Sequence, residues 1–402
     1  MNRTKINWPD TLTEKTFKRK YWQKKPVLIR NLFPKEIATN SPVSKQDIID
    51  LSKIESVPTK CVYKRKDWHV KHGPLTKKIV TNLRDANWTI LVDKVNTQLS
   101  DADRFFHFFN FIDLFRLKDL MVSLSNNGGS VGPHYDSYDV FLVQGHGQKL
   151  WQLSSNFDPT LENNPDLKIL KTFKAEEEFI LNPGDTLYLP PNIAHNGISL
   201  KDDSITYSIG FKHPAILELT DKVLFYHMDN ISSSRESSLK YFKIKTSRDP
   251  LDFSDEMINY FAEEIIKLMP NYEKIKKYVV KTITESDADV VNRIINKDIK
   301  FHNFLVHLNK KDLYINPAMK AVFWKDNLFY DGEELDLSAL SEREHKVTKT
   351  LLKELIENRM ISSGTIIPYF KFKRALKIIF FLYRENLLTF KKLRSHEVSH
   401  NL

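Results

Sequence analysis

Two histidines and one aspartate in this chain could together hold a metal ion. His134 and Asp136 are separated by one residue, and His195 lies further along the chain. Two imidazoles and one carboxylate bind Fe(II) on one face and leave other positions open, which is the ligand set of non-haem iron oxygenases. Residues two apart in an extended strand point to the same side, so His134 and Asp136 can bind the same ion. The sequence therefore predicts a metal site formed by these three residues.

The His-x-Asp pattern by itself is weak evidence for such a site. The chain has 13 histidines and 51 acidic residues, so about 1.6 matches to His-x-Asp/Glu are expected by chance. Two matches occur, beginning at His134 and at His227. The first lies between two predicted strands, after the turn-rich segment 126–133. The second lies in segment 217–230, where the pattern is helical and residues two apart diverge by roughly 200°, so we interpret it as surface.

His195 and Lys149 extend the predicted site. His195 follows two consecutive prolines that fix the turn before it, and a later strand is where the third ligand should lie. Lys149 lies in a predicted strand beyond Asp136 and can supply a buried cation for the far carboxylate of 2-oxoglutarate, which chelates iron through its keto acid. Taken alone, His195 also fits a half-buried loop histidine, and Lys149 also fits a solvated strand lysine.

The segment that carries these residues has the pattern of β-structure. Eight of the eleven glycines fall between Gly128 and Gly210, and glycine supplies the positive φ angles of tight turns. Antiparallel strands in the predicted number usually close into a barrel or a sandwich. The loop at 145–148 contains glycine and has the length of a hairpin connection between two of the strands. The predicted strands are residues 120–125, 139–144, 149–153, 178–181, 186–189 and 204–211.

The hydrophobic period changes after about residue 215. Ser254 is a predicted helix N-cap, and four apolar residues recur at helical spacing through 257–268, as core or dimer contacts do. From about residue 310 a hairpin is predicted around Asp331-Gly332. A capping box at Ser341 to Glu344 and a helix near 372–385 follow it. A hairpin with two helices is compatible with a winged-helix module.

The composition is that of a folded protein with two or three domains. The 402 residues are 41% hydrophobic and 28% charged, which is ordinary for a globular chain. Cys61 is the only cysteine, which excludes an intrachain disulfide and suits a reducing compartment. We expect a cytoplasmic protein without a signal peptide or membrane span, because the apolar run at 378–383 is too short. The net charge of +10 permits a polyanionic partner such as ribosomal RNA, or it reflects biased composition.

Several segments of the first 215 residues resemble the bacterial JmjC ribosomal oxygenases. The resemblance implies an α+β chain that begins with a JmjC/cupin-type double-stranded β-helix (jelly-roll) barrel in residues 1–215, with its core at about 90–213. A helical dimerisation region in 216–305 and a C-terminal winged-helix domain with a basic tail in 306–402 would follow. The resembling segments are 21–30, 72–74, 87–92, 120–125, 131–141, 188–195 and 207–211.

The resemblance also implies an activity. It is that of an Fe(II)- and 2-oxoglutarate-dependent dioxygenase, which uses O2 to hydroxylate an arginine at C3 in a large-subunit ribosomal protein and acts as a homodimer. The residues that match the iron ligands are His134, Asp136 and His195. Ser125 and Lys149 match the residues that bind the far carboxylate of 2-oxoglutarate. Lys149 departs from the arginine expected in the bacterial family, because lysine keeps the charge but loses the bidentate geometry.

Tyr138 and Asp139 follow the metal motif directly and are predicted either to contact the substrate arginine or to be structural strand residues. Since the substrate is itself basic, we expect the positive charge of this chain to lie away from the cleft. Three other functions remain open from the sequence. They are a histidyl hydroxylase of another ribosomal protein, a metal-binding cupin of another class such as an isomerase, and a winged-helix nucleic-acid binder with salt-sensitive binding.

Overall fold

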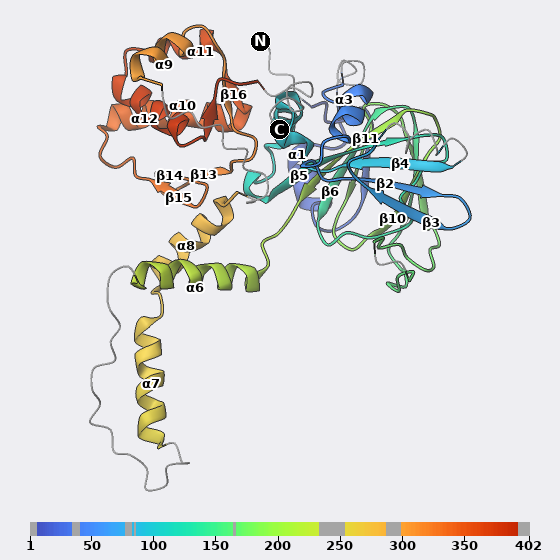
Figure 1. Cartoon of the computed structure of the whole chain (residues 1–402), viewed down its shortest axis with the longest axis horizontal. Coiled ribbons are helices and arrows are strands. Elements are labelled where there is room, and N and C mark those ends of the chain that lie inside the picture. The colour runs from blue at the N-terminus through green and yellow to red at the C-terminus, as the bar shows by residue number, and fades with distance from the viewer. Residues whose placement is uncertain are drawn as a thin grey trace. The chain divides into compact units, whose positions relative to one another are not determined.

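The computed structural model divides the chain into two compact units (Figure 1). The first unit comprises Met1–His213, Asp289–Ala318 and Leu340–Leu402, and the second comprises Pro214–Ala288 and Met319–Ala339. None of the described helices combines the length and the apolar character needed to cross a membrane. The residues that the structure describes are 6–33, 41–76, 83, 86–163, 166–232, 254–286 and 299–392.

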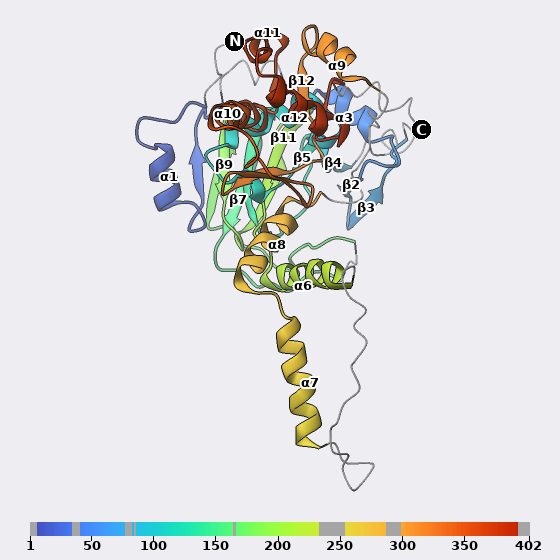
Figure 2. The same ribbon diagram turned by 90° about the vertical axis from the view of Figure 1, so that its left-hand side faces the viewer.

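Two antiparallel sheets form the barrel of the first unit. The larger sheet has the strand order β1-β9-β6-β11-β5-β4-β2-β3, and the smaller one has the order β10-β7-β8. Figure 2 shows the succession across the larger sheet from β9 to β3. The strands are β1 (Val27–Ile29), β2 (Thr59–Lys64), β3 (Trp68–His72), β4 (Asn87–Val92), β5 (Leu117–Ser125), β6 (Asp139–His146), β7 (Lys149–Ser154), β8 (Glu177–Leu181), β9 (Thr186–Leu189), β10 (Ala194–Ser199) and β11 (Ser204–Phe211).

The pairing of β6 and β7 differs from the prediction. All six predicted strands are present, but β6 pairs with β9 and β11 in the larger sheet. β7 pairs with β8 and β10 in the smaller sheet. The predicted hairpin is therefore wrong, because the short loop carries the chain from one sheet to the other. Such a crossing is typical of a jelly-roll.

Both faces of the central strands are buried. β11 is buried at all eight positions. Along β6, Phe141 lies in one large core with Phe17, whereas Leu142 lies in a second core with Trp151. Strands buried on both faces have continuous apolar sequences instead of alternating ones. The helical segments of this part are α1 (Glu14–Lys20), α3 (Lys45–Leu51), α5 (Ser100–Arg104) and the 3-10 segments η1 (Val95–Thr97), η2 (Phe105–Phe109) and η3 (Leu114–Arg116).

The C-terminal part of the first unit combines helices with the sheet β16-β12-β17. Ser341 caps α10 by accepting a hydrogen bond from the N–H of Glu344, and the predicted second helix is α12. Arg359 forms two hydrogen bonds of 2.8 and 2.9 Å to the largely buried carboxylate of Asp103 in α5. Because breaking a buried ion pair is strongly destabilising, this pair holds the C-terminal part against the barrel. Its elements are α9 (Phe301–Leu308), β12 (Leu313–Ile315), α10 (Glu342–Asn358), β16 (Met360–Ile361), α11 (Ser363–Ile366), η5 (Ile367–Tyr369), α12 (Lys373–Arg384) and β17 (Leu388–Thr389).

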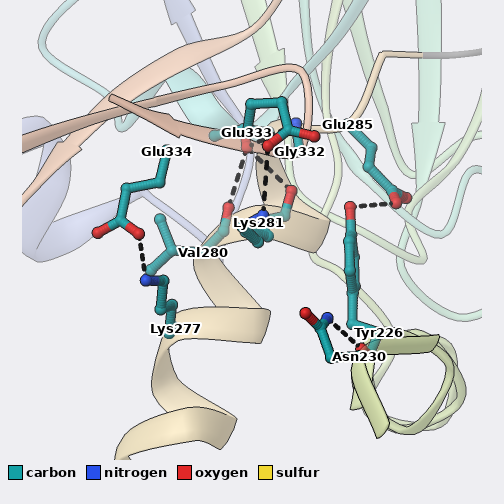
Figure 3. Close-up of polar contacts among 10 residues, drawn as sticks. Tyr226, Asn230, Lys277, Val280, Lys281, Glu285, Gly332, Glu333 and Glu334 are labelled. Atoms are coloured by element: carbon teal, nitrogen blue, oxygen red, sulfur yellow. Dashed lines mark hydrogen bonds and ion pairs between the residues drawn. The ribbon is translucent and has the colours of Figure 1, made fainter. Parts of the chain in front are cut away.

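The second unit contains three helices and a three-stranded meander, and α8 packs against both α6 and the meander. Ser254 caps α7 as predicted. Asp331 and Gly332 both have positive φ and join β14 to β15, so the predicted hairpin is confirmed. Ion pairs connect Lys277 with Glu334 and Lys281 with Glu333 (Figure 3). The elements are α6 (Ile216–Ser232), α7 (Asp255–Leu268), α8 (Tyr272–Thr284), β13 (Ala321–Trp324), β14 (Asn327–Tyr330) and β15 (Glu333–Leu335).

The second His-x-Asp match lies in α6, as the helical pattern predicts. His227 is only 5% exposed, so its assignment to the surface is wrong. Its Nε2 lies 2.6 Å from the carbonyl oxygen of Leu268 and donates to it. The adjacent Tyr226 donates a hydrogen bond of 2.6 Å to Glu285 (Figure 3). The imidazole of His227 is therefore a buried packing element.

Candidate metal centre and its pocket

His134, Asp136 and His195 come together in the first unit. One potential ligand atom from each lies within 4.8 Å of the others, and among the described residues this is the one cluster that could hold a metal. A pair of backbone hydrogen bonds, 3.0 and 2.8 Å long, joins His134 to His195 at the start of β10. The carbonyl of Asp136 accepts a hydrogen bond of 2.8 Å from the N–H of Asn192. Short local contacts therefore align the two chain segments.

Backbone carbonyls orient both imidazole rings. Nδ1 of His134 lies 2.9 Å from the oxygen of Gly132, and Nδ1 of His195 lies 2.9 Å from the oxygen of Ile193. A carbonyl can only accept, so each Nδ1 carries a proton, and Nε2 is the ring atom that can face a metal ion. Such a hydrogen bond is the usual way in which a protein orients a metal-binding histidine.

The protonation state of His195 also suits metal binding. Burial and the neighbouring His134 lower the pKa of His195 to about 4, against the opposing effect of Asp136. The ring is therefore neutral at physiological pH. Its Nε2 lies 3.9 Å from Oδ2 of Asp136, which leaves room for an ion between them. Two imidazoles and one carboxylate fit Fe(II), with positions left for further ligands.

A cavity of about 390 Å³ opens beside the three residues and extends to Lys149. The side chain of Lys149 is 4% exposed, and its Nζ contacts the hydroxyls of Ser123 and Thr206 at 3.5 and 3.4 Å. Among the described residues, no carboxylate forms an ion pair with it. Burial lowers the pKa of Lys149 to about 8. A buried cation without a counter-ion fits the far carboxylate of 2-oxoglutarate.

The indole of Trp151 lies close to both the metal ligand His195 and the buried cation of Lys149. Its ring centroid lies 5.8 Å from that of His195 and 5.4 Å from Nζ of Lys149. Residues 149, 151 and 153 point to one side of β7, and β10 pairs with β7. The pleat of β7 and its pairing with β10 therefore position the buried cation beside the metal ligands.

Two of the predicted residues do not line the cavity. Ser125 is fully buried, and its hydroxyl lies 2.9 Å from that of Thr89, so Ser123 takes the place predicted for it beside Lys149. Asp139 accepts a hydrogen bond from Tyr188 and another from Gln23. Its carboxylate belongs to the aromatic core on the other side of β6, which corrects the predicted contact with the substrate.

Tyr138 does line the cavity, together with Asp93 and Asp119. The phenol of Tyr138 lies beside the carboxylate of Asp136, and burial and this carboxylate raise the pKa of Tyr138. Burial also raises the pKa of Asp93. The sequence analysis missed both aspartates and Ser123. The two-residue spacing of Asp119, Met121 and Ser123 along β5, all on one face, was the available signal.

Tyr138 is expected to position Asp136. Tyr138→Phe keeps the ring but removes the hydroxyl beside the carboxylate of Asp136, and outer partners of metal ligands typically contribute about 10- to 100-fold in affinity. Titration with Co(II) should show a loss of this size. Tyr135→Phe is the matched control, because Tyr135 lies between the two ligands and its ring packs on Phe157. An equal loss in both variants would contradict the positioning role.

The comparisons with known proteins agree with this geometry. The JmjC domain family matches residues 104–219. A probable ribosomal oxygenase of Haemophilus influenzae is 31% identical over 374 residues, which cover 84% of this chain and 91% of that protein. The ribosomal protein uL16 3-hydroxylase of Escherichia coli is 30% identical over 286 residues, which cover 70% of this chain and 72% of that protein.

A solved structure shows the same fold. The Escherichia coli ribosomal oxygenase YcfD in complex with cobalt and 2-oxoglutarate matches with a TM-score of 0.75 at 24% identity, over 96% of this chain and 99% of that chain. The predicted JmjC barrel is thus confirmed. From the identity and coverage of its relatives, the chain belongs to the ribosomal oxygenase family of JmjC-domain proteins.

Proposed function

We propose that this protein is an Fe(II)- and 2-oxoglutarate-dependent hydroxylase that modifies an arginine of the large-subunit ribosomal protein uL16 at C3. The observation that carries the proposal is a single cavity with His134, Asp136 and His195 at one place and the buried cation of Lys149 at another. The Escherichia coli relative is named as a uL16 3-hydroxylase, which supports the choice of substrate.

The chain's own residues bind and orient the reactants. The two histidines and Asp136 would hold Fe(II), and Lys149 with Ser123 and Thr206 would hold the far carboxylate of 2-oxoglutarate. When bound, iron and 2-oxoglutarate supply the oxidant that inserts one atom of O2 into a C–H bond and yields succinate and CO2. Apolar walls formed by Leu142, Trp151 and Ile169 exclude water from the cavity.

Asp119 and Asp93 are the candidates for the arginine side chain. Both line the cavity, and the carboxylate of Asp119 is 13% exposed. A guanidinium ion needs planar acceptors with little water around them. The ring of Tyr138 offers a flat surface beside them, but Lys118 already lies 4.2 Å from its centroid. We propose that the substrate arginine displaces Lys118 toward solvent and pairs with Asp119.

Assembly and location are also proposals. The second unit exposes apolar side chains on α6 and α7, which supports a homodimer formed through the helical region 216–305. A ribosomal substrate would place the enzyme in the cytoplasm. The exposed apolar residues include Ile216, Leu217, Phe225, Met228, Ile258, Ile265 and Ile266.

The test is mass spectrometry of uL16 peptides after incubation with the protein, Fe(II) and 2-oxoglutarate. We expect one arginine to become heavier by one oxygen atom, and fragmentation to place the oxygen on the side chain. A parallel set of histidine-containing ribosomal peptides tests the alternative. If histidine were oxidised and arginine were not, the proposed arginine substrate would be wrong. If succinate formed without either product, the oxygenase reaction would stand and the substrate would be a different one.

A further inference from the structure

The hairpin formed by β2 and β3 carries several exposed basic side chains beside the cavity. Its residues, Thr59 to His72, include five lysine or arginine residues and two histidines but one aspartate. β3 is the last strand of the larger sheet. Lys64, Lys66 and Lys71 are exposed, and no carboxylate of the described residues pairs with them. These cations are therefore available to an anionic partner.

Charge alone does not define that partner. Lysines on an edge strand also prevent it from pairing with another sheet. The hairpin carries aromatic rings as well: those of Tyr63 and His69 are stacked, with centroids 5.1 Å apart and an angle of 22°. Nζ of Lys64 lies 4.9 Å from the ring centroid of Trp68. Flat rings and exposed cations on one hairpin suit the bases and phosphates of a single-stranded nucleic acid, whereas an acidic peptide would use the cations alone.

One face of the hairpin is continuous with the cavity wall. Trp68 packs against a buried cluster that includes Val62 and Leu167. Val62 pairs with Val70, and Lys64 pairs with Trp68, so the side chains at 60, 62, 64, 68 and 70 share one face. Tyr63 pairs with His69 and Cys61 with Lys71, so these side chains lie on the other face. Lys60 and Val62 on this face line the cavity, as does Lys168. A strand of nucleic acid that passes around the exposed turn of the hairpin would contact both faces and would lie beside the cavity on one of them.

We propose that single-stranded nucleic acid binds around the exposed turn of the β2–β3 hairpin. Lys64 and Lys66 would contact phosphates beside the turn, and Lys71 would contact a phosphate on the opposite face, where His69 would stack on a base. This interaction goes beyond the proposed hydroxylation and does not depend on it. It explains why a chain of net charge +10 carries unpaired cations close to its catalytic cavity. A nucleic acid held there would also attract a basic substrate protein toward the cavity.

Fluorescence anisotropy of the full chain with a labelled uridine oligonucleotide tests the proposal. We expect the combined variant Lys64→Gln, Lys66→Gln and Lys71→Gln to weaken binding on the order of tenfold or more. Its slope of log K against log salt should be smaller by about 2, because each single-strand phosphate contact contributes about 0.7. His69→Ala keeps every lysine and should weaken binding by about tenfold through lost stacking.

The matched control removes three exposed lysines elsewhere in the first unit, with Lys310→Gln, Lys311→Gln and Lys353→Gln. It has the same net charge as the hairpin variant and should bind almost as tightly as the native chain. Equal weakening in both variants would overturn the proposal, because only bulk charge would then attract the oligonucleotide. No binding by the native chain, or equal displacement by polyglutamate of the same charge, would overturn it too.

The melting temperature of each variant shows whether the fold is intact. The exposed positions make unfolding unexpected, and a hairpin variant that melts early is replaced by Lys64→Gln with Lys71→Gln, for which the expected slope change is about 1.4. A deoxyuridine oligonucleotide in parallel separates the two kinds of nucleic acid. Binding of either with the expected loss supports the hairpin site, and the tighter of the two identifies its natural class.

Discussion

Replacing Asp136 with alanine is expected to weaken metal binding by at least about 100-fold and to abolish hydroxylation. Asp136 is the one carboxylate in the cluster with His134 and His195. Without it, two imidazoles and no carboxylate remain, and the loss of a direct ligand should exceed the loss caused by an outer partner. Co(II) titration measures the affinity, and succinate formation from 2-oxoglutarate measures the activity.

The second His-x-Asp match in the chain provides the control. Asp229→Ala removes an exposed carboxylate with the same sequence spacing from a histidine. It should bind Co(II) and turn over like the native chain, because His227 is bonded to a backbone carbonyl. If Asp136→Ala still bound Co(II) with native affinity, or if Asp229→Ala lost it, the assignment of the metal centre would be wrong.

Lys149→Met is expected to stabilise the ligand-free fold and to destroy 2-oxoglutarate binding. Burial lowers the pKa of Lys149 from 10.5 to about 8, so the protonated side chain destabilises the fold on the order of 3 kcal/mol. Methionine of similar length should recover part of this free energy of unfolding. The far carboxylate of 2-oxoglutarate would then be buried without a cation, which should raise its Kd at least about 100-fold.

The stability gain should depend on pH in a defined direction. The pKa of Lys149 is lower in the folded chain than in the unfolded chain, so stability rises as pH increases from about 8 to 10.5. Below pH 8 both states are protonated and the penalty is fully present. The advantage of Lys149→Met in urea unfolding should therefore be constant below pH 8 and shrink above it.

Lys149→Arg shows whether 2-oxoglutarate binding depends on the positive charge at position 149 or on the packing of the lysine side chain. It keeps a cation and should retain 2-oxoglutarate binding, with bidentate geometry available to the carboxylate. Calorimetric titration of 2-oxoglutarate into all three proteins gives the comparison. If Lys149→Met bound 2-oxoglutarate with native affinity, Lys149 would not belong to the co-substrate site. If that variant were less stable than the native chain, the hydroxyls of Ser123 and Thr206 would fully compensate the burial of the Lys149 cation.

Much of the site could be predicted because its signals are local. The spacing of His134 and Asp136 puts them on one side of an extended segment, and the prolines before His195 set its turn. The six predicted strands are present because their apolar runs and bounding turns are short-range features. The same holds for the cap at Ser254 and the turn at Asp331-Gly332, where one or two residues determine the geometry.

Other features required the tertiary structure, because they depend on contacts between residues far apart in the chain. Whether β6 pairs with β7 or crosses to another sheet is decided by the partners of both strands. Ser125 and Ser123 lie on the same face of β5, and only the position of Lys149 on a different sheet selects Ser123. Asp139 faces away from the cavity and accepts a hydrogen bond from Tyr188, which lies forty-nine positions away.

The kind of chemistry that the site can perform thus follows from local sequence, whereas the full set of residues that form the site does not. Side-chain type and spacing determine that a metal, a carboxylate and a cation can meet in one barrel. Which hydroxyls and aspartates surround them depends on sheet register and on burial, which change the pKa of Lys149 and select the carbonyls that orient His134 and His195. Register is a property of paired strands, so no single segment contains it.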